Sequence, residues 1–64
     1  MPKITLRAAR INRGLLQTDV AKRLKVSART VGNWETGRSY PKATDLMELC
    51  QMYGVSLDDI ILPK

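Results

Sequence analysis

The chain has 64 residues, a formal net charge of +5, one cysteine and no histidine. This length predicts one domain, because a chain so small buries only about 60% of the surface that its unfolded form exposes. A single cysteine excludes an internal disulfide, and the lack of histidine excludes Ser-His or Cys-His catalysis and metal sites built on Cys/His clusters.

The excess of positive charge favours phosphate polyanions as partners, although the same charge can serve solubility alone. The six carboxylates lie mostly at predicted helix starts or in salt-bridge positions and form no catalytic pair. We therefore expect no enzyme activity, no metal and no cofactor. The first residues lack a long apolar segment, and no apolar run approaches membrane-spanning length, so we expect a cytoplasmic protein.

The first helix is predicted over residues 4–12, with Leu6 and Ala9 at its core positions. Gly14 ends it, because glycine readily takes the left-handed conformation found after helix C-termini. A second helix is predicted over residues 17–24, where three apolar residues share one face at helical spacing. These are Val20, Ala21 and Leu24.

A third helix, over residues 28–35, follows a tight turn. Ser27 begins it, because a serine hydroxyl can accept a bond from an otherwise unpaired helix N–H. Val31 and Trp34 form its apolar face, which predicts a buried Trp34 in preference to a base-stacking one. The opposite face is small and polar, and it is formed by Arg29, Gly32, Asn33 and Thr36.

That polar face indicates recognition of DNA. Arginine and asparagine can bond base edges through two hydrogen bonds when their helix lies in a major groove. A helix that exposes such residues and is supported by a second helix has the helix-turn-helix arrangement.

The remaining chain predicts two further helices after a basic loop at residues 38–42. The helix over residues 43–53 has a buried stripe at i, i+3, i+4 and i+7, and Ser56–Asp59 matches the Ser-x-x-Asp signature of a fifth helix start. The stripe consists of Leu46, Leu49, Cys50 and Tyr53. With five short helices and no strand pattern, we expect an all-α fold in which helices two and three form the helix-turn-helix, centred on residues 17–36.

An ordered set of residues from Leu6 to Leu62 resembles the lambda-repressor-like helix-turn-helix family of phage repressors, Cro proteins and XRE-like bacterial regulators. The matching elements are Leu6…Arg10…Gly14-Leu15…Gln17, Val20-Ala21…Leu24…Val26-Ser27, Val31…Trp34-Glu35…Gly37, Pro41…Leu46…Leu49 and Val55-Ser56-Leu57. The resemblance implies a compact five-helix bundle that binds operator DNA, commonly as a two-fold dimer. It also implies that the helix matching residues 27–35 enters the major groove.

The resemblance and the polar face together suggest specific roles. The alternative for each residue is an ordinary solvated surface position. For Arg29 and Asn33 a phosphate contact is a further alternative, for Ala28 a good helix former, and for Gln17 a plain first-turn residue. Arg10 and Glu35 are expected to form a structural salt bridge, as the resemblance implies. Base contacts are expected from Ala28, Arg29 and Asn33, and phosphate contacts from Gln17, Thr18, Thr36, Arg38, Ser39 and Lys42.

Three residues depart from the family's usual pattern. Lys25 stands where the turn commonly has glycine, and a left-handed non-glycine residue costs about 1 kcal/mol. Leu16 stands where a Ser or Thr cap usually precedes the glutamine, which costs about 1 kcal/mol. Gly32 lies inside the recognition helix at a similar propensity cost, roughly 1 kcal/mol.

The end of the chain supplies more apolar area than one short helix needs. The candidate dimer surface consists of Leu57, Ile60, Ile61 and Leu62, and the alternative is that all four close the core. The leading hypothesis is a small sequence-specific transcriptional regulator, a repressor that occupies promoter DNA. It would be encoded by a bacterium or phage, associated with the nucleoid, and without an evident small-molecule ligand. The alternative is an antitoxin or another protein-interaction module with the same fold.

Overall fold

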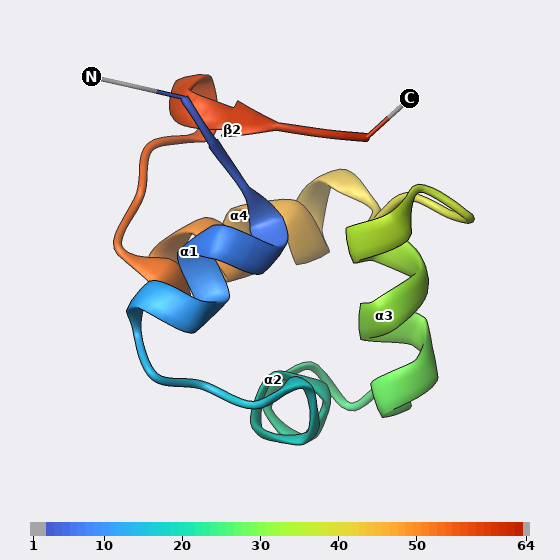
Figure 1. The fold of residues 1–64 in the computed structure, drawn as a ribbon. Coiled ribbons are helices and arrows are strands. Elements are labelled where there is room, and N and C mark those ends of the chain that lie inside the picture. The colour runs from blue at the N-terminus through green and yellow to red at the C-terminus, as the bar shows by residue number, and fades with distance from the viewer. Residues whose placement is uncertain (1–2, 64) are drawn as a thin grey trace.

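Four α-helices make up most of the computed structural model, which describes residues 3–63 (Figure 1). Residues 1, 2 and 64 of the expected single domain lie outside the described part. In chain order the elements are β1 (Ile4–Thr5), α1 (Leu6–Asn12), α2 (Gln17–Leu24), α3 (Ala28–Thr36), α4 (Ala43–Tyr53), the 3-10 turn η1 (Leu57–Asp59) and β2 (Ile60–Ile61).

The first helix begins later than expected. The Thr5 hydroxyl accepts a hydrogen bond from the Ala8 amide at 3.1 Å and caps α1, so the helix begins at Leu6 and not at Ile4. Threonine is a good N-cap because its oxygen pairs an amide that the helix leaves free. Ile4 and Thr5 instead form β1.

The expected fifth helix is wrong. Ser56 does cap a turn, through an Asp58 amide bond of 3.3 Å, but that turn is the three-residue η1 and the chain then becomes β2. Only six residues separate Ser56 from Pro63, and so short a segment gains too few helical hydrogen bonds to offset helix nucleation.

The two short strands also correct the expectation of a fold without strands. β1 and β2 pair in parallel, with Ile4 opposite Ile60 and Thr5 opposite Ile61. This pairing brings the first and last described residues to one end of the molecule, and α2 lies at the other end (Figure 1). The molecule is thus a mostly helical globule closed by a minimal sheet.

The core lies between the four helices and consists of aliphatic and aromatic side chains. The largest of the fully buried side chains are Leu6, Val20, Val31 and Leu49, one from each helix. Trp34 is 5% exposed and belongs to this core, as the apolar face of its helix predicts. Burying these side chains is the main favourable contribution to folding in so small a domain.

The turn between α2 and α3 has the strained geometry that its sequence suggested. Lys25 has φ 58° and ψ 42° and is the left-handed C-cap of α2. Ser27 then caps α3 by accepting a hydrogen bond from the Thr30 amide at 3.1 Å. This turn fixes the angle at which α3 leaves α2.

Candidate nucleic-acid interface

Helix α3 lies along one side of the molecule (Figure 1). Its inward side is fixed by Val31 and Trp34, which are 1% and 5% exposed. Its outward side therefore faces solvent along the length of the helix. A supported helix with a free polar face is the geometry that a major groove accepts.

The three residues expected to contact bases differ in exposure. Arg29 is exposed, whereas Asn33 is half-buried and lies one helical turn further along the same face. Ala28 is half-buried and packs against the core, so only part of its methyl group faces outward. Arg29 therefore has the greatest reach of the three.

The residues expected to contact phosphates border this face at both ends. Thr18 is exposed in the first turn of α2, and Thr36 is exposed at the end of α3, where its hydroxyl donates to the Gly32 carbonyl at 3.2 Å. Arg38, Ser39 and Lys42 are all exposed in the segment at residues 37–42, which we call the α3–α4 loop.

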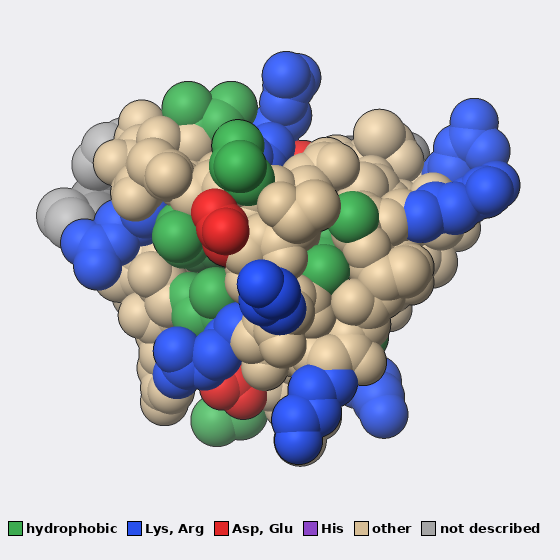
Figure 2. Space-filling view, turned by 90° about the horizontal axis from the view of Figure 1, so that it is seen from below, with side chains coloured by type: hydrophobic (Ala, Val, Ile, Leu, Met, Phe, Trp, Pro, Cys, Tyr) green, Lys and Arg blue, Asp and Glu red, His purple; other side chains and the backbone are tan. Residues whose placement is uncertain are grey.

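Basic side chains surround the α2 end of the molecule. Figure 2 views this end directly and shows Lys and Arg side chains projecting around its rim, with few carboxylates between them. Such a distribution gives a positive potential that attracts a polyanion before specific contacts form. The exposed basic residues of α2, α3 and the segments that follow them are Lys22, Arg23, Lys25, Arg29, Arg38 and Lys42.

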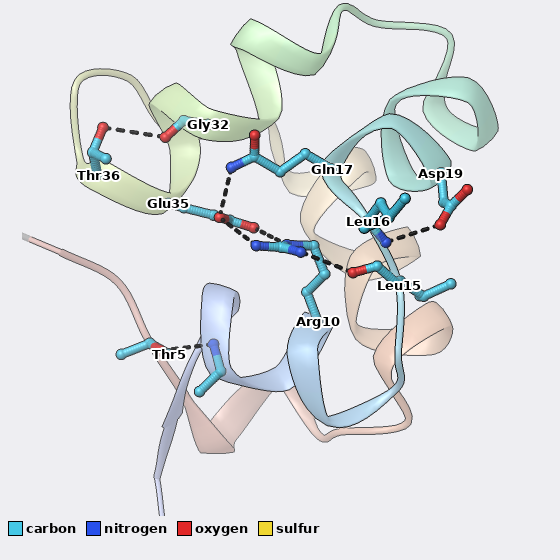
Figure 3. Close-up of polar contacts among 10 residues, drawn as sticks. Thr5, Arg10, Leu15, Leu16, Gln17, Asp19, Gly32, Glu35 and Thr36 are labelled. Carbon is cyan, nitrogen blue, oxygen red and sulfur yellow. Dashed lines mark hydrogen bonds and ion pairs between the residues drawn. The ribbon is translucent and has the colours of Figure 1, made fainter.

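A buried ion pair fixes the end of α3 against α1. Arg10 Nε lies 2.7 Å from Glu35 Oε2, and the two side chains are 10% and 3% exposed. Arg10 Nη2 also donates to Glu35 Oε1, and Nη1 donates to the Leu15 carbonyl at 2.8 Å (Figure 3). The expected pair is thus present, and it also holds the connection between α1 and α2.

Gln17 belongs to the same cluster, through a contact with Glu35 that sequence spacing does not give. Its Nε2 donates to Glu35 Oε1 at 3.0 Å, and its amide lies against Gly32, at 3.5 Å from the position of an added Cβ (Figure 3). Gln17 therefore couples the start of α2 to the middle and end of α3. One Nε2 hydrogen remains for the phosphate contact expected of this residue.

The start of α2 has an unusual cap. Leu16 has no side-chain acceptor, but its amide donates to Asp19 Oδ2 at 2.8 Å (Figure 3). Asp19 also lies in the first turn, where a carboxylate is favoured by the helix dipole. This carboxylate compensates in part for the missing Ser or Thr cap.

The surroundings raise the pKa of three side chains in this region, those of Arg10, Tyr53 and Cys50. The hydrogen bond to Glu35 raises the pKa of the Arg10 guanidinium, although burial opposes this effect. Burial, reinforced by the Glu35 charge, raises the pKa of Tyr53 to about 12. Burial also raises the pKa of the Cys50 thiol, which disfavours its reactive thiolate form.

Within residues 3–63, no helix is both long and apolar enough to cross a membrane. The same part of the chain holds no group of three or more Cys, Asp or Glu side chains placed to bind a metal ion.

Comparison with known proteins identifies the fold. The sequence model of a helix-turn-helix family matches residues 6–60, which is most of the chain. The chain belongs to this helix-turn-helix family. The XRE-like resemblance seen in the sequence is thereby confirmed. Membership of this family supports the prediction that the chain is a DNA-binding regulator.

One curated relative is the HTH-type transcriptional activator BcrR of Enterococcus faecalis. It is 29% identical over 56 residues, which are 88% of this chain and 28% of the relative. The chain thus spans little more than a quarter of that protein's length. No solved structure matches the chain.

Proposed function

We propose that this helix-turn-helix chain binds specific sites in double-stranded DNA with α3 in the major groove and regulates transcription. One observation carries the proposal: Val31 and Trp34 hold α3 rigidly on the core while its outer side, with Arg29, stays free. The supporting observations are the basic surroundings of this helix and the family to which the chain belongs.

Sequence reading is assigned to the outer face of α3. Arg29 would donate two hydrogen bonds to guanine O6 and N7, which discriminates by about 1–3 kcal/mol. Asn33 would pair with an adenine or reach a phosphate, and Ala28 would touch a thymine methyl group. Gly32 offers no side chain to the bases, and the Gln17 amide lies 3.5 Å from the position that its Cβ would take.

Affinity is assigned to the residues around that face. Gln17 and Thr18 would hold the phosphates of one strand at the start of α2. The α3–α4 loop would hold those beyond α3, through Arg38, Ser39 and Lys42, with Thr36 beside it. Each basic contact should contribute about one unit to the dependence of log K on log salt.

The regulatory outcome that we propose is repression by occupation of a promoter. A bound domain of this kind excludes other proteins from the DNA that it covers, and this needs no contact beyond the domain itself. The name of the relative describes it as an activator, and the activity of that protein cannot be transferred from a match to 28% of its length.

The decisive experiment is selection of bound sequences from a random duplex library at physiological salt, followed by titration of variants. Wild type should select a defined site. Arg29→Ala should relax the preference at one base pair, at a cost of about 1–3 kcal/mol for the preferred base.

Arg38→Ala is the matched control, because it removes the same charge from the loop. It should weaken all sites alike, without a change in preference. Weak, sequence-independent binding by wild type would disprove the proposed function, and identical effects of the two variants would disprove the division into reading and anchoring residues.

A further inference from the structure

The first half of the α3–α4 loop is fixed to the end of α3. The Asn33 carbonyl accepts hydrogen bonds from the amides of Gly37, Arg38 and Ser39, at 3.0, 3.0 and 3.4 Å. This carbonyl therefore determines where the chain emerges from α3. Arg38 and Ser39 are held close to the helix by this triple contact.

The second half of the loop is held differently. Within the described part of the chain, the backbone of Tyr40 and Pro41 makes no hydrogen bond to other backbone groups. The Tyr40 hydroxyl instead donates to the Pro63 carbonyl at 2.6 Å, across 23 residues of sequence. Because the Tyr40 residue is 52% exposed, this bond, more than burial, fixes its position.

The acceptor lies on a well-anchored segment. Ile60 and Ile61 pair with β1, and Leu62 packs against the core immediately before Pro63. Pro41 contributes as well, since the residue before a proline is confined to extended conformations and Tyr40 has few alternatives. A single hydroxyl thus connects the far half of the loop to the sheet that joins the two ends of the chain.

We propose that Tyr40 is a positioning residue for DNA binding, and that the C-terminal segment holds the α3–α4 loop in the conformation that reaches phosphates. This inference rests on the proposed function, and it adds the element that prepares the loop. A loop that is ordered before binding loses less conformational entropy on the DNA. The C-terminal segment thereby controls affinity without affecting which bases are read.

The first test is Tyr40→Phe, which removes only the hydroxyl. Affinity should fall about two- to tenfold at every site, because one neutral hydrogen bond is lost and the loop must be ordered on binding. The selected sequence should not change. In the free protein, hydrogen exchange of the Ser39 amide, which donates to the Asn33 carbonyl, should become faster, while exchange in α2 stays as in wild type.

The second test separates the tether from a direct contact between the Tyr40 hydroxyl and DNA. Removal of residues 63 and 64 deletes the acceptor and leaves the tyrosine in place. If the tether is correct, Tyr40→Phe should have no further effect on affinity in this shortened chain. If Tyr40→Phe weakens binding equally in the full and shortened chains, the hydroxyl contacts DNA directly and the proposal is overturned.

Ser56→Ala provides a control for general loosening of the C-terminal segment. It also removes one hydroxyl from that segment, the one that caps η1, but it leaves Tyr40 and Pro63 unchanged. DNA affinity should stay within twofold of wild type, on the order of the smallest single hydrogen-bond effect. An equal loss in Ser56→Ala and Tyr40→Phe would contradict a specific tether.

The exchange measurement also distinguishes this proposal from the proposed function. If wild type selects no DNA sequence but Tyr40→Phe accelerates exchange at Ser39, the tether exists and the DNA-binding function is wrong. If wild type binds DNA while Tyr40→Phe changes neither affinity nor exchange, the function stands and the tether is wrong.

Discussion

At the scale of single residues, the Arg10–Glu35 ion pair is the feature most sensitive to substitution. Both charges are largely removed from water, and each is paired by good hydrogen bonds. Removing one partner of such a pair leaves the other charge buried and uncompensated. The pair is therefore a point where a small chemical change should have a large effect on stability.

Glu35→Gln should lower the free energy of unfolding by about 2–3 kcal/mol, because the amide keeps an oxygen acceptor but not the countercharge. Urea unfolding at pH 7 measures this effect. Glu48→Gln is the matched control, since the Arg23–Glu48 pair is 3.8 Å apart with side chains 63% and 40% exposed. Its effect should stay below about 1 kcal/mol. Equal losses in the two variants would show that burial of the first pair has no energetic consequence.

Tyr53 makes stability depend on pH above neutrality. Its pKa is raised to about 12 in the folded chain, whereas an unfolded tyrosine ionises near pH ~10. The contribution of Tyr53 to the free energy of unfolding is therefore fully present below pH ~10. It is lost as the pH rises toward about 12, because Tyr53 releases its phenolic proton at a lower pH in the unfolded chain than in the folded chain. At pH ~11 the loss should be about 1 kcal/mol.

Tyr53→Phe isolates this contribution, because all other titratable groups are the same in both proteins. The stability of wild type should fall more steeply between pH ~9 and ~11 than that of the variant, by about 1 kcal/mol in total. Chemical denaturation at both pH values measures the difference. If stability depends on pH in the same way in wild type and variant, Tyr53 has the same pKa in the folded and unfolded chains.

At the scale of elements, the turn between α2 and α3 stores strain at Lys25. Its φ of 58° is left-handed, a region that costs a side chain about 1–2 kcal/mol and glycine almost nothing. Lys25→Gly should therefore raise the free energy of unfolding by about 1 kcal/mol. Thermal unfolding would show a higher Tm.

Lys22→Gly is the corresponding control inside α2. The same pair of residue types is exchanged on an exposed helical position, where glycine costs about 1 kcal/mol. The two substitutions should therefore have opposite signs. If both destabilise the chain, the side chain of Lys25 makes a favourable contact that outweighs its backbone strain.

The elements also show what local sequence can and cannot predict. Helices α2 and α4 have the predicted limits, because the apolar periodicity lies within each segment and Gly54 ends α4. The β1–β2 pairing joins residues near opposite ends of the chain, and no local pattern encodes such a partner. The contact of Gln17 with Glu35 likewise requires the crossing of α2 and α3, which sequence spacing does not give.

At the scale of the whole molecule, we propose that two copies bind one DNA site. The domain measures 30 × 24 × 19 Å, and successive major grooves on one side of a duplex are about 34 Å apart. Two copies placed side by side would therefore reach adjacent grooves. Of the candidate dimer residues, Ile60 and Leu62 pack against the core, which leaves Leu57 and Ile61 facing solvent at 51% and 43% exposed.

We expect Ile61→Lys to prevent pairing through this surface, because a buried lysine without a partner is strongly disfavoured in an apolar contact. Affinity for a palindromic site should fall about tenfold or more, while affinity for an isolated half-site should be unchanged or slightly higher, since the second copy no longer contributes. Fluorescence anisotropy on the two duplexes, with sedimentation of the bound complexes, measures both quantities.

Ile11→Lys separates this effect from charge alone. Ile11 is 54% exposed on α1, outside the candidate dimer surface, and the substitution adds the same positive charge. It should change palindrome and half-site binding equally. A palindrome-specific loss in Ile61→Lys and not in Ile11→Lys would place the dimer contact at β2. Equal behaviour of the two variants would exclude β2 as the dimer contact and leave Ile61 as an ordinary exposed side chain of the sheet.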